Sequence, residues 1–250
     1  MKAGLNFRDV GGYLTKDGSR VARGRVYRSS SLARITEDDR TAIERLGLRV
    51  ILDFRATPER LAHPSRLPRS GNIEIWTRDH GSSSGDLVAA LSRPGNTAER
   101  SHRIMMKVYR SLAYEQAPSY RELFSRLAMG QFSILFHCSF GKDRTGIAAA
   151  LLLDMLGVPR DVVVGDYTLT DAFFQDILEN ALEDLGGSGL EGVDQNIWTP
   201  MLRADAAYIE AFFAAITSEH GSTEGFLRNV LKLSPAMIEA VRTQLLTDEG

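Results

Sequence analysis

The chain reads His137-Cys138-Ser139-Phe140-Gly141-Lys142-Asp143-Arg144-Thr145-Gly146 in the stretch that holds its only cysteine, six residues before an arginine. The preceding residues 132–136 are apolar, aromatic and β-branched, which is typical of a buried parallel strand. Residues 147–153 have high helix propensity and contain no helix breaker. The stretch therefore predicts a strand, a short loop that begins with the cysteine, and a helix.

The predicted loop has the properties of a phosphate-binding site. The first turn of a helix exposes unpaired N–H groups and about half a positive charge, and both stabilise a bound oxyanion. Gly141 allows the backbone to approach the anion closely, and the planar guanidinium of Arg144 can hold two of its oxygens. The residues expected to bind the phosphate are Ser139, Phe140, Gly141, Lys142, Asp143 and Arg144.

Cys138 is the expected nucleophile, because the helix terminus, Lys142 and Arg144 together favour its thiolate form. Thr145 can donate a hydrogen bond to the sulfur and make it a better leaving group in the second step. His137 is either a strand-end residue bonded to backbone or a supporting residue that orients the loop. A lone cysteine is most often a small buried hydrophobe, but the glycines and the threonine between strand and helix favour the catalytic interpretation.

This loop resembles that of the cysteine-dependent protein tyrosine phosphatases. More narrowly, the chain resembles a bacterial family typified by the mycobacterial secreted phosphatase PtpB. The narrower resemblance rests on segments spread over almost the whole chain: Asn6-Phe7-Arg8-Asp9-Val10-Gly11-Gly12-Tyr13, Tyr27-Arg28-Ser29-Ser30, Asp53-Phe54-Arg55, Glu59-Arg60, the loop, Asp166-Tyr167 and His220-Gly221-Ser222-Thr223-Glu224-Gly225-Phe226-Leu227. It implies hydrolysis of phosphate monoesters through a cysteinyl-phosphate intermediate.

The reaction needs a general acid that protonates the leaving oxygen, and two carboxylates are candidates. The resemblance implies that Asp143, inside the loop, is this acid; alternatively it is an aspartate stabilised by the helix dipole. Asp79 follows the predicted strand 72–76 and lies where other tyrosine phosphatases carry a mobile acid loop, or is an ordinary loop residue. Asp53 is expected to be structural, as the partner of Arg8 or Arg28.

Residues 81–85 are flexible by composition, and residues 86–114 have apolar positions suited to a helix. In the resembled family this region forms a helical lid over the active site. A lid over about residues 81–115 is therefore one interpretation, and a core-facing crossover helix is the other. The segment is shorter here than in the mycobacterial protein, which argues against a full two-helix lid. In a lid, Tyr109 could reach the substrate.

The order of the predicted elements indicates an α/β fold with a tyrosine-phosphatase-like parallel sheet flanked by helices. Ligands bind such sheets beyond the carboxyl ends of the strands. The C-terminal part is expected to be all helical, with helices that open at Pro159 and at Ser234-Pro235, within a single domain over residues 1–250. The expected strands are 25–27, 49–54, 72–76 and 132–137, with a helix over 37–46 capped by Thr36 and closed by Gly47.

Composition agrees with one compact enzyme domain: of 250 residues, 43% are hydrophobic and 25% charged. The net charge of −2 argues against a nucleic-acid partner. We expect no integral membrane segment, because no apolar run has the necessary length. The N-terminus lacks a signal-peptide pattern, so the expected location is a bacterial cytosol, or outside the cell through a system that reads no such signal. No cofactor or metal is expected, since no His, Asp or Glu cluster has ligand spacing.

Three function classes fit a cysteine loop. The first is a phosphatase acting on phosphotyrosine in proteins, with phosphoserine and phosphothreonine as further substrates; phosphoinositides are the alternative, because Lys142 adds charge suited to polyphosphorylated head groups. The second is a sulfur-transfer or arsenate-reducing enzyme, but arsenate reduction usually needs resolving thiols, which the chain lacks. The third is a non-catalytic phosphate-binding module, which would be expected to lack Cys138 or Arg144.

Overall fold

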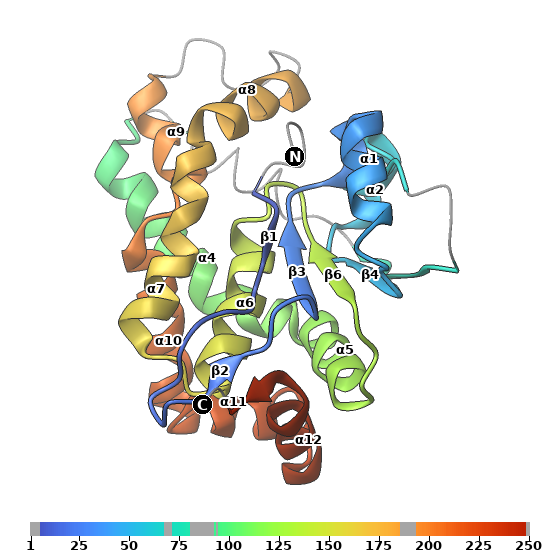
Figure 1. Cartoon of the computed structure of the whole chain (residues 1–250). Coiled ribbons are helices and arrows are strands. Elements are labelled where there is room, and N and C mark those ends of the chain that lie inside the picture. Colours follow the sequence, from blue (N-terminus) through green and yellow to red (C-terminus); the bar gives the residue numbers. More distant parts are fainter. Residues whose placement is uncertain (1–5, 68–71, 81–92, 94, 186–193, 249–250) are drawn as a thin grey trace.

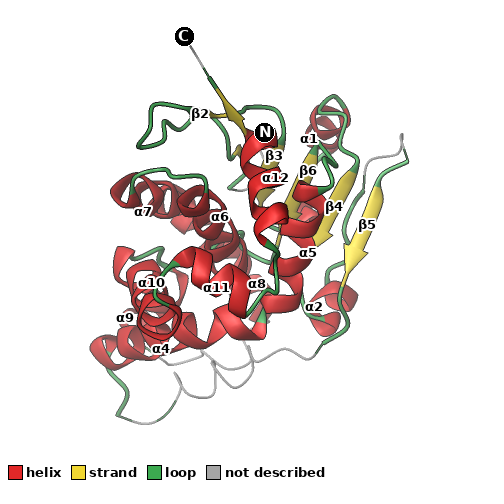
Figure 2. Cartoon of the chain, turned by 90° about the horizontal axis from the view of Figure 1, so that it is seen from below, coloured by secondary structure: helices red, strands yellow, loops and turns green. Residues whose placement is uncertain are grey.

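The computed structural model describes residues 6–67, 72–80, 93, 95–185 and 194–248. A five-stranded sheet has the strand order β1-β3-β6-β4-β5. Figure 1 shows β1, β3, β6 and β4, and Figure 2 shows β5 beside β4. Its strands are β1 (Arg8–Asp9), β3 (Val26–Ser29), β6 (Ile134–His137), β4 (Val50–Asp53) and β5 (Glu74–Thr77). β3, β6, β4 and β5 run parallel, and β1 pairs antiparallel with β3. The predicted parallel sheet is therefore confirmed.

The central strands are buried on both faces, which explains why their sequences are apolar without alternation. Two of the three hydrophobic cores of the described residues include residues of the sheet. Along β4, Val50 and Leu52 belong to the larger of these two, and Ile51 belongs to the smaller core on the other face. The sheet thus separates two layers of helices.

Helices from most of the chain supply the larger core: α4 (Ala98–Glu115), α5 (Ala117–Ala128), α6 (Asp143–Met155), α7 (Arg160–Thr168), α10 (Ala206–His220), α11 (Thr223–Asn229) and α12 (Pro235–Leu245). The smaller core includes Leu32 of η1 (Leu32–Arg34) and Ile43 of α1 (Glu37–Glu44). Figure 2 shows α1 and α5 on opposite sides of the sheet. The remaining elements are α2 (Thr57–Ala62), η2 (Leu169–Phe173), α8 (Phe174–Leu185), α9 (Gln195–Leu202) and the antiparallel pair β2 (Arg20–Val21) and β7 (Leu246–Thr247). No helix within the described ranges combines the length and apolarity needed to cross a membrane.

The register of the parallel strands brings three carboxyl ends to one level. Ser29 at the end of β3 and Asp53 at the end of β4 both pair with His137 at the end of β6. Cys138 follows at once, so the loop after β6 begins at the edge of the sheet where ligands are expected.

The helix predictions are largely confirmed. α1 begins after the Thr36 cap, whose hydroxyl accepts from the N–H of Asp39, and Gly47 has a φ of +62° just beyond its end. The helix ends at Glu44, two residues earlier than predicted. α7 begins directly after Pro159, and α12 begins at Pro235 with Ser234 as its cap.

The strand predictions locate β3, β4, β5 and β6 to within about two residues at each end. They miss β1, β2 and β7, which have two residues each. A strand of two residues is too short to show an alternating pattern of apolar and polar residues. Its pairing depends on the partner strand, so its own sequence does not identify it.

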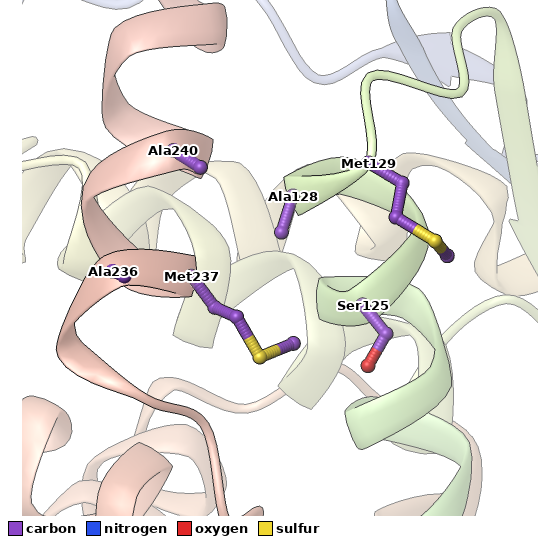
Figure 3. A pocket seen from close by; sticks show the side chains of 6 residues that line it. All are labelled: Ser125, Ala128, Met129, Ala236, Met237 and Ala240. Carbon is purple, nitrogen blue, oxygen red and sulfur yellow. The ribbon is translucent and has the colours of Figure 1, made fainter.

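An apolar hollow of about 350 Å³ lies between α5 and α12 (Figure 3). It is lined by Ser125, Ala128, Met129, Ala236, Met237 and Ala240. Because α5 ends shortly before β6 begins, the hollow lies near the amino end of β6, whereas Cys138 follows the carboxyl end. The hollow is therefore separate from the site described next.

Candidate active site

Cys138 lies between the end of β6 and the start of α6 and is 2% exposed. Five residues separate it from Arg144, which lies in the first turn of the helix. Among the described residues, no backbone hydrogen bond uses the N–H groups of residues 139–144 as donors. The predicted unit of strand, loop and helix is confirmed, and its loop has the unpaired donors that an oxyanion site requires.

Two carbonyl groups of the loop accept hydrogen bonds from residues within or next to β1 and β3. The Ser139 carbonyl accepts from the N–H of Ser31 at 2.9 Å, and the Gly141 carbonyl accepts from Asn6 Nδ2 at 2.9 Å and from Arg28 Nη2 at 2.9 Å. In a trans peptide the carbonyl and the following N–H point in opposite directions. The N–H groups that follow these carbonyls, those of Phe140 and Lys142, therefore point away from the sheet.

Gly141 is required by close packing against β3. Its φ is +64°, and a Cβ at this position would lie 2.5 Å from the Ser29 carbonyl oxygen. Any other residue would push the loop away from the strand. From the sequence, this glycine is expected to allow the approach of an anion, whereas the structure gives a different reason for it: approach of the loop to the strand behind it.

Asp166 fixes the arginine that supports the loop. Its Oδ2 accepts from Arg28 Nη1 at 2.7 Å, and its Oδ1 accepts from Arg8 Nε at 3.0 Å and from the Tyr13 hydroxyl at 3.0 Å. Burial alone would raise the pKa of Asp166, but the two guanidinium groups hold this pKa below its ordinary value. The carboxylate is therefore kept charged inside the protein.

The expectation that Asp53 pairs with Arg8 or Arg28 is wrong. Asp53 instead pairs with Arg55, whose Nη2 lies 2.6 Å from Asp53 Oδ2. Arg55 is only two residues further along the chain, so its guanidinium reaches the carboxylate at the end of β4. His137 Nε2 lies 3.7 Å from the same oxygen. Burial lowers the pKa of His137, against the opposing effect of Asp53. His137 is thus a buried residue at the end of β6, directly before the loop.

Arg144 is held by a two-pronged contact with Glu59 from α2. Nη1 donates to Oε2 at 2.6 Å and Nη2 donates to Oε1 at 2.7 Å. Burial would raise the pKa of Glu59, but the hydrogen bonds and charge of Arg144 lower it to about 2. Ser139 also donates to Oε1, so the carboxylate joins the loop to the arginine.

Glu59 is a site residue that the sequence does not reveal, since it stands out there only as part of a family-like segment. The local signal is Thr57-Pro58-Glu59, a helix start in which Glu59 Oε2 accepts from the Ala56 N–H at 2.7 Å. That pattern predicts a cap but not a partner 85 residues away.

Lys142 and Asp143 turn toward the helical part of the protein. Lys142 is fully buried, and its Nζ lies 2.8 Å from Asp143 Oδ1 and donates to the Met201 carbonyl at 2.8 Å. Asp143 Oδ1 also accepts from the Tyr109 hydroxyl at 2.6 Å. The ammonium of Lys142 is therefore bound to protein acceptors.

Asp79 lies apart from this cluster. Its side chain is 87% exposed, and Oδ1 accepts from Arg60 Nη2 at 2.6 Å and from the Thr57 hydroxyl at 3.1 Å. Both partners belong to α2, the helix that also carries Glu59. Thr145 is buried, and its hydroxyl has no hydrogen-bond partner among the described residues. It is therefore available to a group that arrives at the loop.

Residues 98–115 of the predicted lid segment form α4, which packs against α9 and α10. Met105, Tyr109 and Leu112 are buried on its inner side. Residues 81–92 and 94 lie outside the described residues. Tyr109 is fully buried, and its hydroxyl donates to Asp143 Oδ1.

Comparisons with known proteins show to which family the chain belongs. A sequence model described as "Tyrosine phosphatase family" matches residues 1–247. The chain is 32% identical to a provisionally named tyrosine-protein phosphatase of Cupriavidus necator over 93% of this chain and 84% of that protein. It is 27% identical to the triple specificity protein phosphatase PtpB of Mycobacterium tuberculosis over 96% of both chains.

A solved structure, the catalytic domain of the PP-IP phosphatase SIW14 of S. cerevisiae, aligns over 88% of this chain and 94% of its own. Its sequence identity is 16% and its TM-score 0.35, so this likeness carries no weight for the site. The match of the family model over nearly the whole length decides the classification. The chain belongs to the tyrosine phosphatase family.

Proposed function

We propose that this enzyme hydrolyses phosphate monoesters in proteins, phosphotyrosine above all, with Cys138 as nucleophile. The observation that carries the proposal is the loop of residues 138–144: a buried cysteine, backbone N–H groups that have no acceptor in the described part of the chain, and an arginine held in place by Glu59. These are the groups that a phosphoryl transfer to sulfur needs, because positioning and charge stabilisation provide most of the catalysis in such reactions.

In the first step the thiolate of Cys138 attacks phosphorus, a P–S bond forms, and the bond from phosphorus to the ester oxygen breaks. The departing oxygen takes a proton from Asp143. In the second step a water attacks phosphorus and gives a proton to Asp143, and the P–S bond breaks to restore the thiolate. The Thr145 hydroxyl stabilises the departing sulfur, and Arg144 holds two equatorial oxygens throughout.

Phosphoserine, phosphothreonine and phosphoinositides are the further substrates to compare. PtpB, which aligns over 96% of this chain, is named a triple specificity phosphatase. The bound position of Lys142 Nζ weakens the argument that its charge selects polyphosphorylated head groups. We place the enzyme in the cytosol, because a reactive thiolate would be oxidised in an oxidising compartment.

A substrate panel tests the proposal: wild-type protein with a phosphotyrosine peptide, a phosphoserine peptide and phosphoinositide vesicles. We expect phosphate release to be fastest from the phosphotyrosine peptide, together with a covalent phosphoenzyme detected by mass spectrometry after rapid acid quench. Absence of turnover on all three substrates would refute the proposed function. Faster release from the vesicles than from either peptide would make the enzyme a lipid phosphatase.

Exchange of each candidate acid for asparagine should identify the proton donor. Asp143→Asn should slow hydrolysis of an alkyl or phenyl phosphate by about a hundredfold or more, because the leaving oxygen then departs unprotonated. A substrate with a good leaving group should be slowed far less. Asp79→Asn should have a smaller effect that does not depend on the leaving group, since its exposed carboxylate is bound to Arg60.

The pH profile provides the second measurement for this pair. The alkaline limb should disappear in Asp143→Asn, because that limb reports deprotonation of the acid, while the acidic limb should remain. If Asp79→Asn loses the alkaline limb and Asp143→Asn keeps it, the acid lies on the loop after β5.

Chelation should leave the rate unchanged. The loop N–H groups and Arg144 supply the positive field around the phosphate, so the proposed steps need no divalent ion. The measurement is turnover of the phosphotyrosine peptide before and after dialysis against EDTA. Loss of activity that returns with an added divalent ion would contradict this mechanism.

A further inference from the structure

The carboxyl group of Asp143 is bound asymmetrically. Oδ1 accepts from the Tyr109 hydroxyl at 2.6 Å and lies 2.8 Å from Lys142 Nζ. Within the part of the chain that the structure describes, no hydrogen bond or ion pair uses Oδ2, and 27% of the side chain is exposed. The two oxygens therefore face different surroundings: one is inside a network of donors, and the other is free to meet a substrate.

The donors at Oδ1 are themselves fixed. Lys142 is fully buried, and its ammonium donates to the carbonyls of Met201 at 2.8 Å and Arg203 at 3.2 Å. The Tyr109 hydroxyl lies 2.6 Å from that of Tyr167. Since Tyr109 has a single hydroxyl proton and gives it to Asp143, the hydroxyl of Tyr167 must donate to Tyr109. Tyr167 and Tyr109 therefore form a chain of hydrogen-bond donors that ends at Asp143 Oδ1.

Both tyrosines remain donors over the working range of pH. Burial, and next the nearby charge of Asp143, raise the pKa of Tyr109 well above its ordinary value. Burial and Asp143 do the same for the pKa of Tyr167. The charged or titratable groups that act on Asp143 from the surrounding elements are Lys142, Arg144, Tyr109 on α4, Tyr120 on α5, Tyr167 on α7 and Tyr208 on α10.

We infer that Tyr109 is a positioning residue for the general acid: with Lys142 it occupies Oδ1 of Asp143, so that the acidic proton resides on Oδ2 and is delivered from there to the leaving oxygen. The inference rests on the proposed function. When Oδ2–H gives up its proton, the O–H bond breaks, a bond to the leaving oxygen forms, and the carboxylate that remains is stabilised at Oδ1. Water returns the proton to Oδ2 in the second step.

The test is Tyr109→Phe, which removes the hydroxyl and keeps the buried ring. Hydrolysis of a phenyl phosphate should fall by about tenfold, and hydrolysis of a substrate with a good leaving group by about twofold or less, because only the first needs the proton. The alkaline limb of the pH profile should move to higher pH, since the carboxylate form loses a donor. A loss of stability alone would not move that limb.

Tyr208→Phe is the matched control. Its hydroxyl donates to the Pro200 carbonyl at 3.0 Å, and its ring centroid lies 5.4 Å from that of Tyr109. The variant removes a buried hydroxyl from the same aromatic cluster and leaves both direct partners of Asp143 Oδ1, Tyr109 and Lys142, in place. The ratio of the two substrate rates should therefore stay at the wild-type value. In an Asp143→Asn background, Tyr109→Phe should cause no further change in that ratio.

The outcomes separate the inference from the function on which it rests. If wild type turns over both substrates and Tyr109→Phe slows them equally, with the alkaline limb unmoved, Tyr109 is structural and the inference fails while the phosphatase remains. The inference also fails if Tyr208→Phe changes the ratio as strongly as Tyr109→Phe does. If wild type turns over neither substrate, the proposed function itself fails.

Discussion

Cys138→Ser should lose at least about 10⁴-fold in kcat and still bind inorganic phosphate. The serine hydroxyl is not ionised at neutral pH and cannot replace the thiolate as nucleophile. The phosphate cradle should survive, because the loop is fixed by contacts that do not involve the sulfur: Arg28 and Asn6 bind the Gly141 carbonyl, and Ser31 binds the Ser139 carbonyl.

Two measurements check this result. Steady-state turnover of the phosphotyrosine peptide gives the loss in kcat, and calorimetric titration with inorganic phosphate gives the affinity. The acid-quenched phosphoenzyme should be present in wild type and absent in the variant. Residual turnover within about tenfold of wild type would rule out the covalent route. Lost phosphate binding with an intact fold would mean that the sulfur, and not the backbone, supports the loop.

The sequence was sufficient for the parts of this protein that depend on neighbouring residues. The strand before Cys138, the helix after it and the Thr36 cap are local patterns, and each lies where the patterns predict. The parallel sheet follows from the alternation of strands and helices. The register that aligns Ser29, Asp53 and His137 is a consequence of that sheet, but no local pattern specifies it.

The supporting contacts could not be read from the sequence, because they join residues far apart in the chain. Glu59 meets Arg144 across 85 residues, and Asp166 meets Arg28 across 138. Asp53 is an example of an ion pair that was predicted wrongly from the sequence. Its carboxylate was expected to bind Arg8 or Arg28, but it binds Arg55. Carboxylates and guanidiniums are numerous enough that charge alone does not select partners.

Lys142 illustrates a second limit. Its place beside Arg144 suggested a charge directed at substrate, yet helix geometry turns the two side chains in different directions. Residues two positions apart at a helix start do not share a face. The ammonium lies among Asp143 and two carbonyls, and the guanidinium faces Glu59.

Arg144→Lys should lower kcat by about a hundred- to a thousandfold, because a point charge cannot hold two equatorial oxygens of the transition state. The lysine ammonium would also be unable to keep the two-pronged contact with Glu59. Glu59→Gln is the matched comparison: it keeps the shape of the side chain and removes its charge, so Arg144 stays present but less firmly oriented. Its loss in kcat should be smaller than that of Arg144→Lys.

The measurements are kcat and KM for the phosphotyrosine peptide, with pH profiles for both variants. Arg144 lowers the pKa of Glu59 to about 2 from an ordinary 4.5. A carboxylate whose pKa is lower in the folded protein contributes stability that is fully present above about pH 4.5 and is lost as the pH falls through about 2. We therefore expect the contact with Arg144 to persist at neutral pH, and an acidic limb at higher pH to report another group. Near-normal kcat in Arg144→Lys would remove Arg144 from its role, and an acidic limb that vanishes in Glu59→Gln would show that Glu59 titrates during catalysis.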